Sequence, residues 1–183
     1  MYVKISGRFF YLIIFIDEYS KYIAHHSLIT SMDADLASLE AHRSIEKLRR
    51  DSVAEPVTQS DNGSLSFALE FKMVLKQNNF TQKLIPPHTP EQNGIVERVN
   101  KTMRETLLPV VLTDYEHASS EISRIVEHYN NERRHSSLNY LIPKQYYKGE
   151  PYVLLAVREA KIEKAGVLRR EKNMIKRKGC ETT

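Results

Sequence analysis

The chain has 183 residues, of which 41% are hydrophobic and 27% are charged, a composition typical of a globular domain. A chain of this length buries a core without cross-links, and its single cysteine, Cys180, excludes an internal disulfide and a cysteine-based zinc site. The longest apolar run, Phe9–Ile16, is too short to span a membrane and lacks the cleavage site of a signal peptide. We therefore expect a cytoplasmic protein with no membrane partner.

Charge divides the chain into two parts. Residues 148–183 carry 10 basic and 5 acidic side chains, whereas residues 1–147 carry 17 and 18, so the tail holds the whole excess of the net charge of +4. We expect a core over 1–147 and a basic helical tail over 148–183. A basic tail suits a polyanionic partner, and a solvated helix explains the same charges equally well.

The N-terminal third predicts strands and turns. A short strand is expected at Tyr2–Ile5, and the aromatic and β-branched run Phe9–Ile16 indicates a strand that is buried on both faces. Asp17–Lys21 is a turn, and a third strand follows over about 22–28. A helix capped by Ser31 or Asp33 then runs to about residue 50.

The middle of the chain alternates between short strands and helices. Strands are predicted over 56–60 and 81–85, and helices over about 67–78, 94–108 and 116–130. The core stripe of the 94–108 helix consists of Val96, Val99, Met103 and Leu107. An antiparallel meander followed by β-α units predicts a mixed sheet flanked by helices.

The last part is less regular. Residues 133–147 are polar and then rich in proline and tyrosine, which favours a segment that wraps around the core rather than a helix. One or two basic helices are expected from Lys148 onward, interrupted at Ala165-Gly166.

Two acidic residues stand where an α/β sheet displays a site. Asp61 follows a predicted strand, and Glu97 lies in the first turn of a predicted helix, with 35 residues between them. Paired carboxylates suit magnesium, and two such ions stabilise both the attacking and the leaving oxygen in phosphoryl transfer. The spacing alone has little specificity, because Asp114 and Glu150 have the same separation and no supporting context.

The surrounding residues are specific. Asp61 lies in Gln59-Ser60-Asp61-Asn62-Gly63, and Glu97 lies in the run 86–100, which reads PPHTPEQNGIVERVN. Together with Tyr129–Leu138 (YNNERRHSSL) and Pro143, these stretches resemble the catalytic core of DDE transposases and retroviral-type integrases, over about residues 1–148. The 129–138 segment resembles that of insertion-sequence transposases.

The resemblance implies a ribonuclease H-like fold, with a five-stranded mixed sheet between helices. It also implies DNA integration or transposition, in which two Mg²⁺ (or Mn²⁺) ions support phosphodiester cleavage and strand transfer. Asp61 and Glu97 match the second and third catalytic and metal-binding acids of the family. The first acid belongs to an Asp-x-Thr-Tyr strand in which Tyr2 here takes the tyrosine's place, so we expect a truncated first strand and a position for that acid before Met1.

Other residues are candidates for DNA contact. Lys101 and Arg104 follow Glu97 on the same helical face and suit phosphate contacts, or equally an ordinary Glu–Lys surface pair. His88 lies in the active-site loop by resemblance, and Asn93 belongs to the same loop, although a helix-start turn also explains Asn93. Asp17 is interpreted as a turn residue, with a substitute metal ligand as the alternative. Whether the 133–135 segment (Arg-Arg-His) packs or binds phosphate stays open.

Three functions compete. The first is a DNA strand-transfer domain from a mobile element, which we expect to be inactive alone without its first acid and to act as a homo-oligomer or with full-length transposase subunits. The second is a non-catalytic remnant that binds DNA or a partner subunit. The third, a plain nuclease of this fold, does not need the Tyr129–Pro143 segment and is disfavoured.

Overall fold

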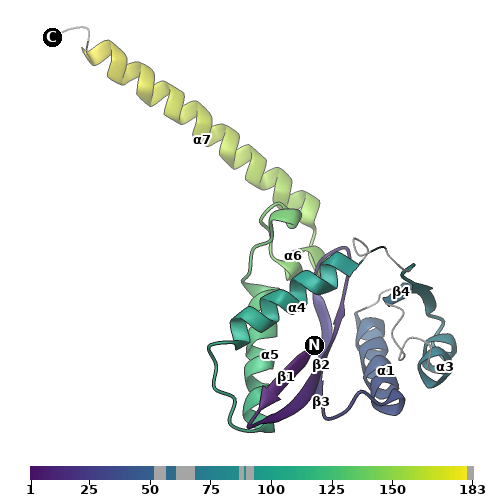
Figure 1. Cartoon of the computed structure of the whole chain (residues 1–183). Coiled ribbons are helices and arrows are strands. Elements are labelled where there is room, and N and C mark those ends of the chain that lie inside the picture. The colour runs from purple at the N-terminus through teal and green to yellow at the C-terminus, as the bar shows by residue number, and fades with distance from the viewer. Residues whose placement is uncertain (52–56, 61–68, 87–88, 90–92, 181–183) are drawn as a thin grey trace.

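The computed structural model describes residues 1–51, 57–60, 69–86, 89 and 93–180 (Figure 1). Its strands are β1 (Tyr2–Ile5), β2 (Arg8–Ile16), β3 (Ile23–Ile29), β4 (Val57–Ser60) and β5 (Thr81–Leu84). Its helices are α1 (Ala34–Arg50), α3 (Leu69–Gln77), α4 (Gly94–Leu107), α5 (Tyr115–Asn131), α6 (Pro143–Tyr147) and α7 (Pro151–Cys180), with a 3₁₀ turn at Ser136–Leu138. The element order predicted up to α5 is confirmed, with ends shifted by a few residues.

The first two strands form a tight hairpin. Ile5 pairs with Arg8, and the two residues between them, Ser6 and Gly7, have positive φ angles of 45° and 85°. Positive φ at both central positions gives a two-residue turn whose twist matches that of the strands, and glycine adopts it without steric cost. β3 then pairs antiparallel with the other edge of β2.

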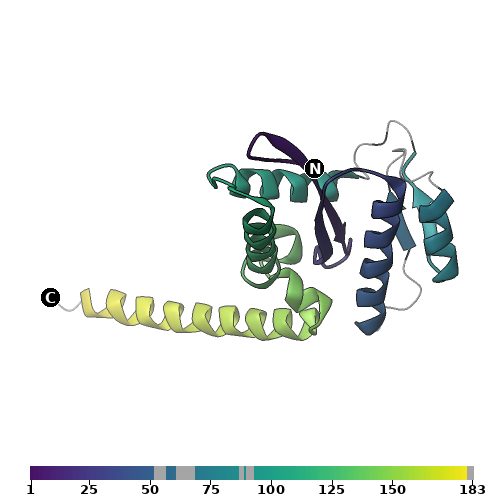
Figure 2. The same ribbon diagram turned by 90° about the horizontal axis from the view of Figure 1, so that it is seen from below.

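The described strands form two sheets and not the single five-stranded sheet expected from the sequence. β1, β2 and β3 make an antiparallel sheet, and β4 and β5 make a parallel pair. Helix α1 separates the two, because it packs on β3 and Phe15 on one side and on α3 on the other (Figure 2). The mixed α/β class is confirmed.

Two hydrophobic cores hold these layers together. Helices α4 and α5 cover one face of the three-stranded sheet, and α1 covers the other (Figures 1 and 2). The core below α4 and α5 includes Val3, Leu12, Met103, Ile122 and Tyr129. The core between α1 and α3 consists of Ala41, Ile45, Phe71, Leu75 and Phe80. The β4–β5 pair is therefore connected to the rest of the molecule through α1.

The expectation that Phe9–Ile16 is buried on both faces is wrong. Leu12 is only 2% exposed, but Phe9 is 61% exposed. Helix α1 packs along β3 and reaches β2 at Phe15, so it leaves the outer part of the hairpin uncovered. Aromatic rings shield one another there, with the centroids of Tyr2 and Tyr11 5.0 Å apart.

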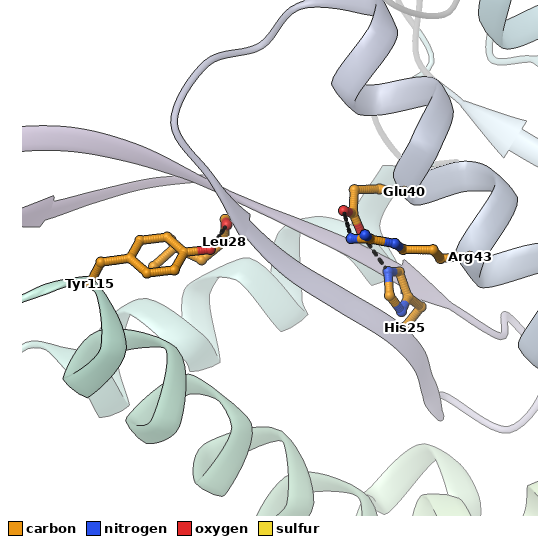
Figure 3. Close-up of polar contacts among 5 residues, drawn as sticks. All are labelled: His25, Leu28, Glu40, Arg43 and Tyr115. Carbon is orange, nitrogen blue, oxygen red and sulfur yellow. Dashed lines mark hydrogen bonds and ion pairs between the residues drawn. The ribbon is translucent and has the colours of Figure 1, made fainter.

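Helix α5 is tied to the β3 backbone at both ends. The Tyr115 hydroxyl donates to the Leu28 carbonyl at 2.7 Å (Figure 3). At the other end, the buried Asn130 side chain accepts from the Ile23 N–H at 2.9 Å and donates to the Ile23 carbonyl at 3.1 Å. A buried backbone N–H and carbonyl need partners, so these bonds satisfy Ile23 and fix α5 along the strand.

A buried carboxylate joins α1 to the opposite face of β3. Glu40 is 2% exposed, and its oxygens lie 2.7 Å from His25 Nε2 and 2.6 Å from the Arg43 guanidinium (Figure 3). A buried charge is stable only when it is paired, and both partners keep part of their surface in water. The contact fixes which face of α1 meets the strand.

Helix α7 is one continuous helix, and the predicted interruption at Ala165-Gly166 is wrong. Gly166 lies on an open helix surface and costs only the usual helix penalty of about 1 kcal/mol relative to alanine, which its neighbours outweigh. The helix projects away from the body in both views (Figures 1 and 2). No helix within the described residues has the length and apolar character needed to cross a membrane.

We expect Asn130→Ala to lower the free energy of unfolding by about 2–3 kcal/mol, because it leaves the buried Ile23 N–H and carbonyl without partners. Urea denaturation followed by circular dichroism measures the change. Asn131→Ala, one position further along the same helix and only partly buried, is the matched control and should cost less than 1 kcal/mol. Equal losses in the two variants would contradict the role given to Asn130.

We also expect stability to fall between pH 6.5 and pH 4. His26 Nε2 lies 3.2 Å from Ser123 Oγ, and burial, followed by the charges of His25 and Lys47, lowers the pKa of His26 from 6.5 to about 4. Between pH 6.5 and pH 4 the unfolded chain therefore binds more protons than the folded chain. The contribution of His26 to the free energy of unfolding is fully present above pH 6.5 and is lost as the pH falls.

The His26→Gln variant removes this titration. Between pH 6.5 and pH 4 its free energy of unfolding should therefore fall by roughly 2–3 kcal/mol less than that of the wild-type chain. Urea titrations at several pH values measure the difference. His42→Gln, at an exposed position of α1, should keep the wild-type pH dependence. A wild-type pH dependence in His26→Gln would show that other groups cause the loss.

Candidate functional site

Helix α4 separates a buried side from an exposed side. Its buried residues are Val99, Thr102, Met103 and Leu107. The exposed side carries Glu97, Lys101 and Arg104, which follow one another at helical spacing. The expectation that Val96 joins the core stripe is wrong, because it is 37% exposed and the core takes Thr102 instead.

The carboxylate of Glu97 is available for a ligand. Glu97 is exposed in the first turn of α4, where the helix dipole favours a negative charge, and it makes no hydrogen bond or ion pair with the other described residues. Lys101 pairs with Glu105 at 3.9 Å and not with Glu97. Lys101 thus does form a Glu–Lys surface pair, although a weak and exposed one.

Two predicted site residues, Asp61 and His88, lie outside the described residues. The residue before Asp61 is placed: Ser60 ends β4, and its carbonyl accepts from the Ile85 N–H at 2.9 Å. Within the described ranges, no three acidic, histidine or cysteine side chains lie close enough together to hold a metal ion. The convergence of Asp61 and Glu97 on one metal therefore stays a prediction.

Asn93 stands immediately before α4 as its N-cap residue. Its backbone has φ −96° and ψ −3°, and its side chain makes no capping bond. Both interpretations of Asn93 are compatible with this placement, because the residue starts the helix while its amide group makes no capping bond to it. Asn93 and Glu97 lie one helical turn apart.

Asp17 is a turn residue, as predicted. Its Oδ2 accepts from the Ser20 N–H at 2.7 Å, and its own N–H donates to the Tyr22 carbonyl at 2.8 Å. The side chain thus stabilises the turn between β2 and β3. The structure gives no support to Asp17 as a substitute metal ligand.

The segment that follows α5 combines packing and exposed charge. Tyr129 is buried, and its burial raises the pKa of its hydroxyl to about 12. The His135 ring packs edge-on against Tyr129, with centroids 4.8 Å apart. Arg133 and Arg134 are exposed, and the Arg134 guanidinium lies 3.5 Å from the Tyr140 carbonyl. The histidine therefore packs, whereas the Arg133 side chain makes no hydrogen bond or ion pair with the other described residues.

Sequence reasoning missed a basic pocket beside α4. It lies between the start of α4, the end of α5 and the 133–137 segment, and its cationic lining residues are Lys21, Arg98 and Arg133. Arg98 directly follows Glu97 in the sequence. The sequence marked Arg98 only by its place in the Val-Glu-Arg run, because the fold alone brings Arg98 close to Lys21 and Arg133.

Residues 78–143 match the integrase core domain family. The chain is 26% identical over 142 residues to the insertion element IS407 uncharacterized 31.7 kDa protein of Burkholderia multivorans, a match that covers 77% of this chain and 50% of that protein. It is 30% identical over 90 residues to the putative transposase InsD for insertion element IS2E of Escherichia coli, covering 49% of this chain and 41% of the relative. The chain thus spans about half the length of the curated relatives it matches.

Solved structures share the fold. The HTLV-2 integrase catalytic core domain, determined in complex with magnesium, aligns with a TM-score of 0.61 and 14% identity over 80% of this chain and 90% of that one. An intasome of simian T-cell lymphotropic virus, in complex with PP2A regulatory subunit B56 gamma, aligns with a TM-score of 0.68 and 14% identity over 82% and 52%. The fold is that of integrase catalytic cores, and the resemblance to transposase and integrase cores that the motifs indicate is confirmed.

Proposed function

We propose that the chain acts in DNA transposition or integration, as an integrase-like core for the cleavage and joining of phosphodiester bonds. The observation that carries the proposal is Glu97, an exposed carboxylate in the first turn of α4 that has no ion pair with another described residue and lies inside the stretch 78–143 that matches the integrase core domain. The transposase relative and the magnesium complex of the HTLV-2 core support the same reaction class.

Asp61 and Glu97 are the proposed ligands of Mg²⁺ or Mn²⁺. Glu97 fits this role because its oxygens are hard ligands without a protein partner among the described residues. A bound divalent ion would stabilise charge on the attacking and leaving oxygens of phosphoryl transfer. Lys101 and Arg104 are placed to bind DNA phosphates along the same face of α4, and Asn93 and His88 are the proposed contacts of the preceding loop.

The first acid of the family has no counterpart in these 183 residues. The sequence contains no Asp-x-Thr-Tyr, and Tyr2 takes the place of its tyrosine. Two carboxylates hold divalent ions more weakly than three, so we propose that a chain of these residues alone binds DNA without cleaving it. The alternative function is that of a non-catalytic remnant of a transposase that binds DNA or a partner subunit.

Helix α7 is the proposed second DNA contact. Its 30 residues include 9 basic and 3 acidic side chains. Helical periodicity places Lys161, Arg169 and Lys172 on one face, and the acidic residues lie on the other side of the helix. These three cations are exposed and form no ion pair among the described residues. A one-sided basic stripe on a projecting helix suits the phosphates of a nucleic acid.

The catalytic proposal is tested by magnesium- or manganese-dependent nicking and strand transfer with the purified 183-residue chain. We expect DNA binding at low salt and no activity above that of the Asp61→Asn and Glu97→Gln variants. An N-terminal extension that restores Asp-x-Thr before Tyr2 should raise activity, because it supplies the third ligand. Activity of the unextended chain that disappears in Asp61→Asn would contradict the proposed deficit.

The stripe on α7 is tested with two variants of equal charge. Lys161→Gln/Lys172→Gln removes two stripe cations, whereas Lys164→Gln/Arg170→Gln removes two cations from other faces of the same helix. Only the first should weaken binding to duplex DNA, and it should lower the slope of log affinity against log salt by about 2, since each phosphate contact contributes about 0.9. Equal loss in both variants would show that net charge, and not a face of α7, attracts DNA.

A further inference from the structure

The basic pocket beside α4 is lined by cations. Three of its described lining residues are Lys21, Arg98 and Arg133, and none of the described lining residues is a carboxylate, although the nearby Asp17 and Glu18 act on Lys21 from outside the lining. Lys21 has positive φ, 59°, and its ammonium donates to the Glu18 carbonyl in the same turn. Three like charges around one pocket repel each other, so the folded chain gains stability from an anion that binds between them.

A partly buried histidine also lines the pocket. His135 is among the lining residues, and its Nε2 is buried without a hydrogen-bond partner among the described residues. Burial, followed by the charges of Arg133, Arg98 and Lys21, lowers the pKa of His135. A buried polar atom without a partner is costly, and an oxyanion can accept a hydrogen bond from this ring. Hydroxyl groups of Thr102 and Ser137 complete the polar lining.

The size of the pocket suits a small anion. Its volume is about 60 Å³, which has room for a few water molecules. A tetrahedral oxyanion fits this volume. Arginine forks bind phosphate oxygens in pairs, and two arginines face this cavity.

We propose that the pocket lined by Lys21, Arg98, Arg133 and His135 binds one phosphate group, supplied by the backbone of the DNA strand. The DNA source rests on the proposed function, whereas the phosphate chemistry does not. Arg98 directly follows Glu97 on α4, so the pocket and the proposed metal-binding carboxylate lie at the same end of that helix. The pocket would then position the strand beside the carboxylate.

The first arm of the experiment uses inorganic phosphate alone. We expect phosphate to raise the thermal midpoint of the full chain more than chloride at the same ionic strength, and to raise the pKa of His135 measured by NMR. Arg133→Gln should abolish both effects. Arg134→Gln, the neighbouring exposed arginine outside the pocket, is the matched control and should retain them. No phosphate effect on the wild-type chain would overturn the site.

The second arm uses duplex DNA. Arg133→Gln should weaken binding about tenfold, the loss expected for one charge-assisted contact, and Arg134→Gln should have a smaller effect. If the wild-type chain binds phosphate but Arg133→Gln and Arg134→Gln bind duplex DNA equally well, DNA does not supply the phosphate group, and free phosphate is the ligand. A wild-type chain that binds phosphate but no DNA would refute the proposed function and keep the pocket.

Discussion

The attachment of α5 to the β3 backbone is the constraint on which the rest of the described core depends. Tyr115 and Asn130 bind the two ends of one strand from the two ends of one helix, so neither sliding nor rotation of α5 is possible without breaking a buried bond. Helix α4 shares its core with α5 and the sheet. The direction in which Glu97 points therefore follows from contacts that are made far from it.

The other half of the candidate site depends on a different set of contacts. Ser60, the residue before Asp61, belongs to the β4–β5 pair, and among the described residues β5 packs on α3, which in turn packs on α1. The buried Glu40, paired with His25, fixes α1 on β3. Ser60 and Glu97 thus belong to elements that lie beside separate cores, and any shift of α1 changes the position of β4 relative to α4.

Local patterns were enough to predict most elements. The apolar run of β2, the periodic apolar residues of α4 and the motif that opens α4 all act through neighbours in the sequence. The sequence does not show that the strands divide into two sheets, because the pairing of strands depends on the side of α1 on which each strand lies. The exposure of Phe9 has the same origin: an apolar run predicts burial, but the length of the covering helix decides how much of it is buried.

The candidate site shows the same limit. The motif identified Glu97 and its exposed helix, because the relevant residues lie within two turns of one another. Asn130 binds a strand residue about a hundred positions away, and His135 has a buried ring nitrogen without a partner among the described residues. No local sequence pattern indicates either feature. Arg98 gains its meaning from Lys21 and Arg133, and only the folded chain brings these three together.

The isolation of α7 has an energetic consequence. Beyond its first turns, where Tyr152 meets Tyr19 and Arg158 lies over Tyr140, nearly every described side chain of this helix faces water. Without a packed face, its helicity depends on intrinsic propensity, which is marginal in water and declines on warming. A polyanion that neutralises the helix would therefore also order it, and part of the binding enthalpy would be helix formation. Association through α7 should then be strongly exothermic and weaken steeply with temperature, unlike the attraction of charge to a rigid surface.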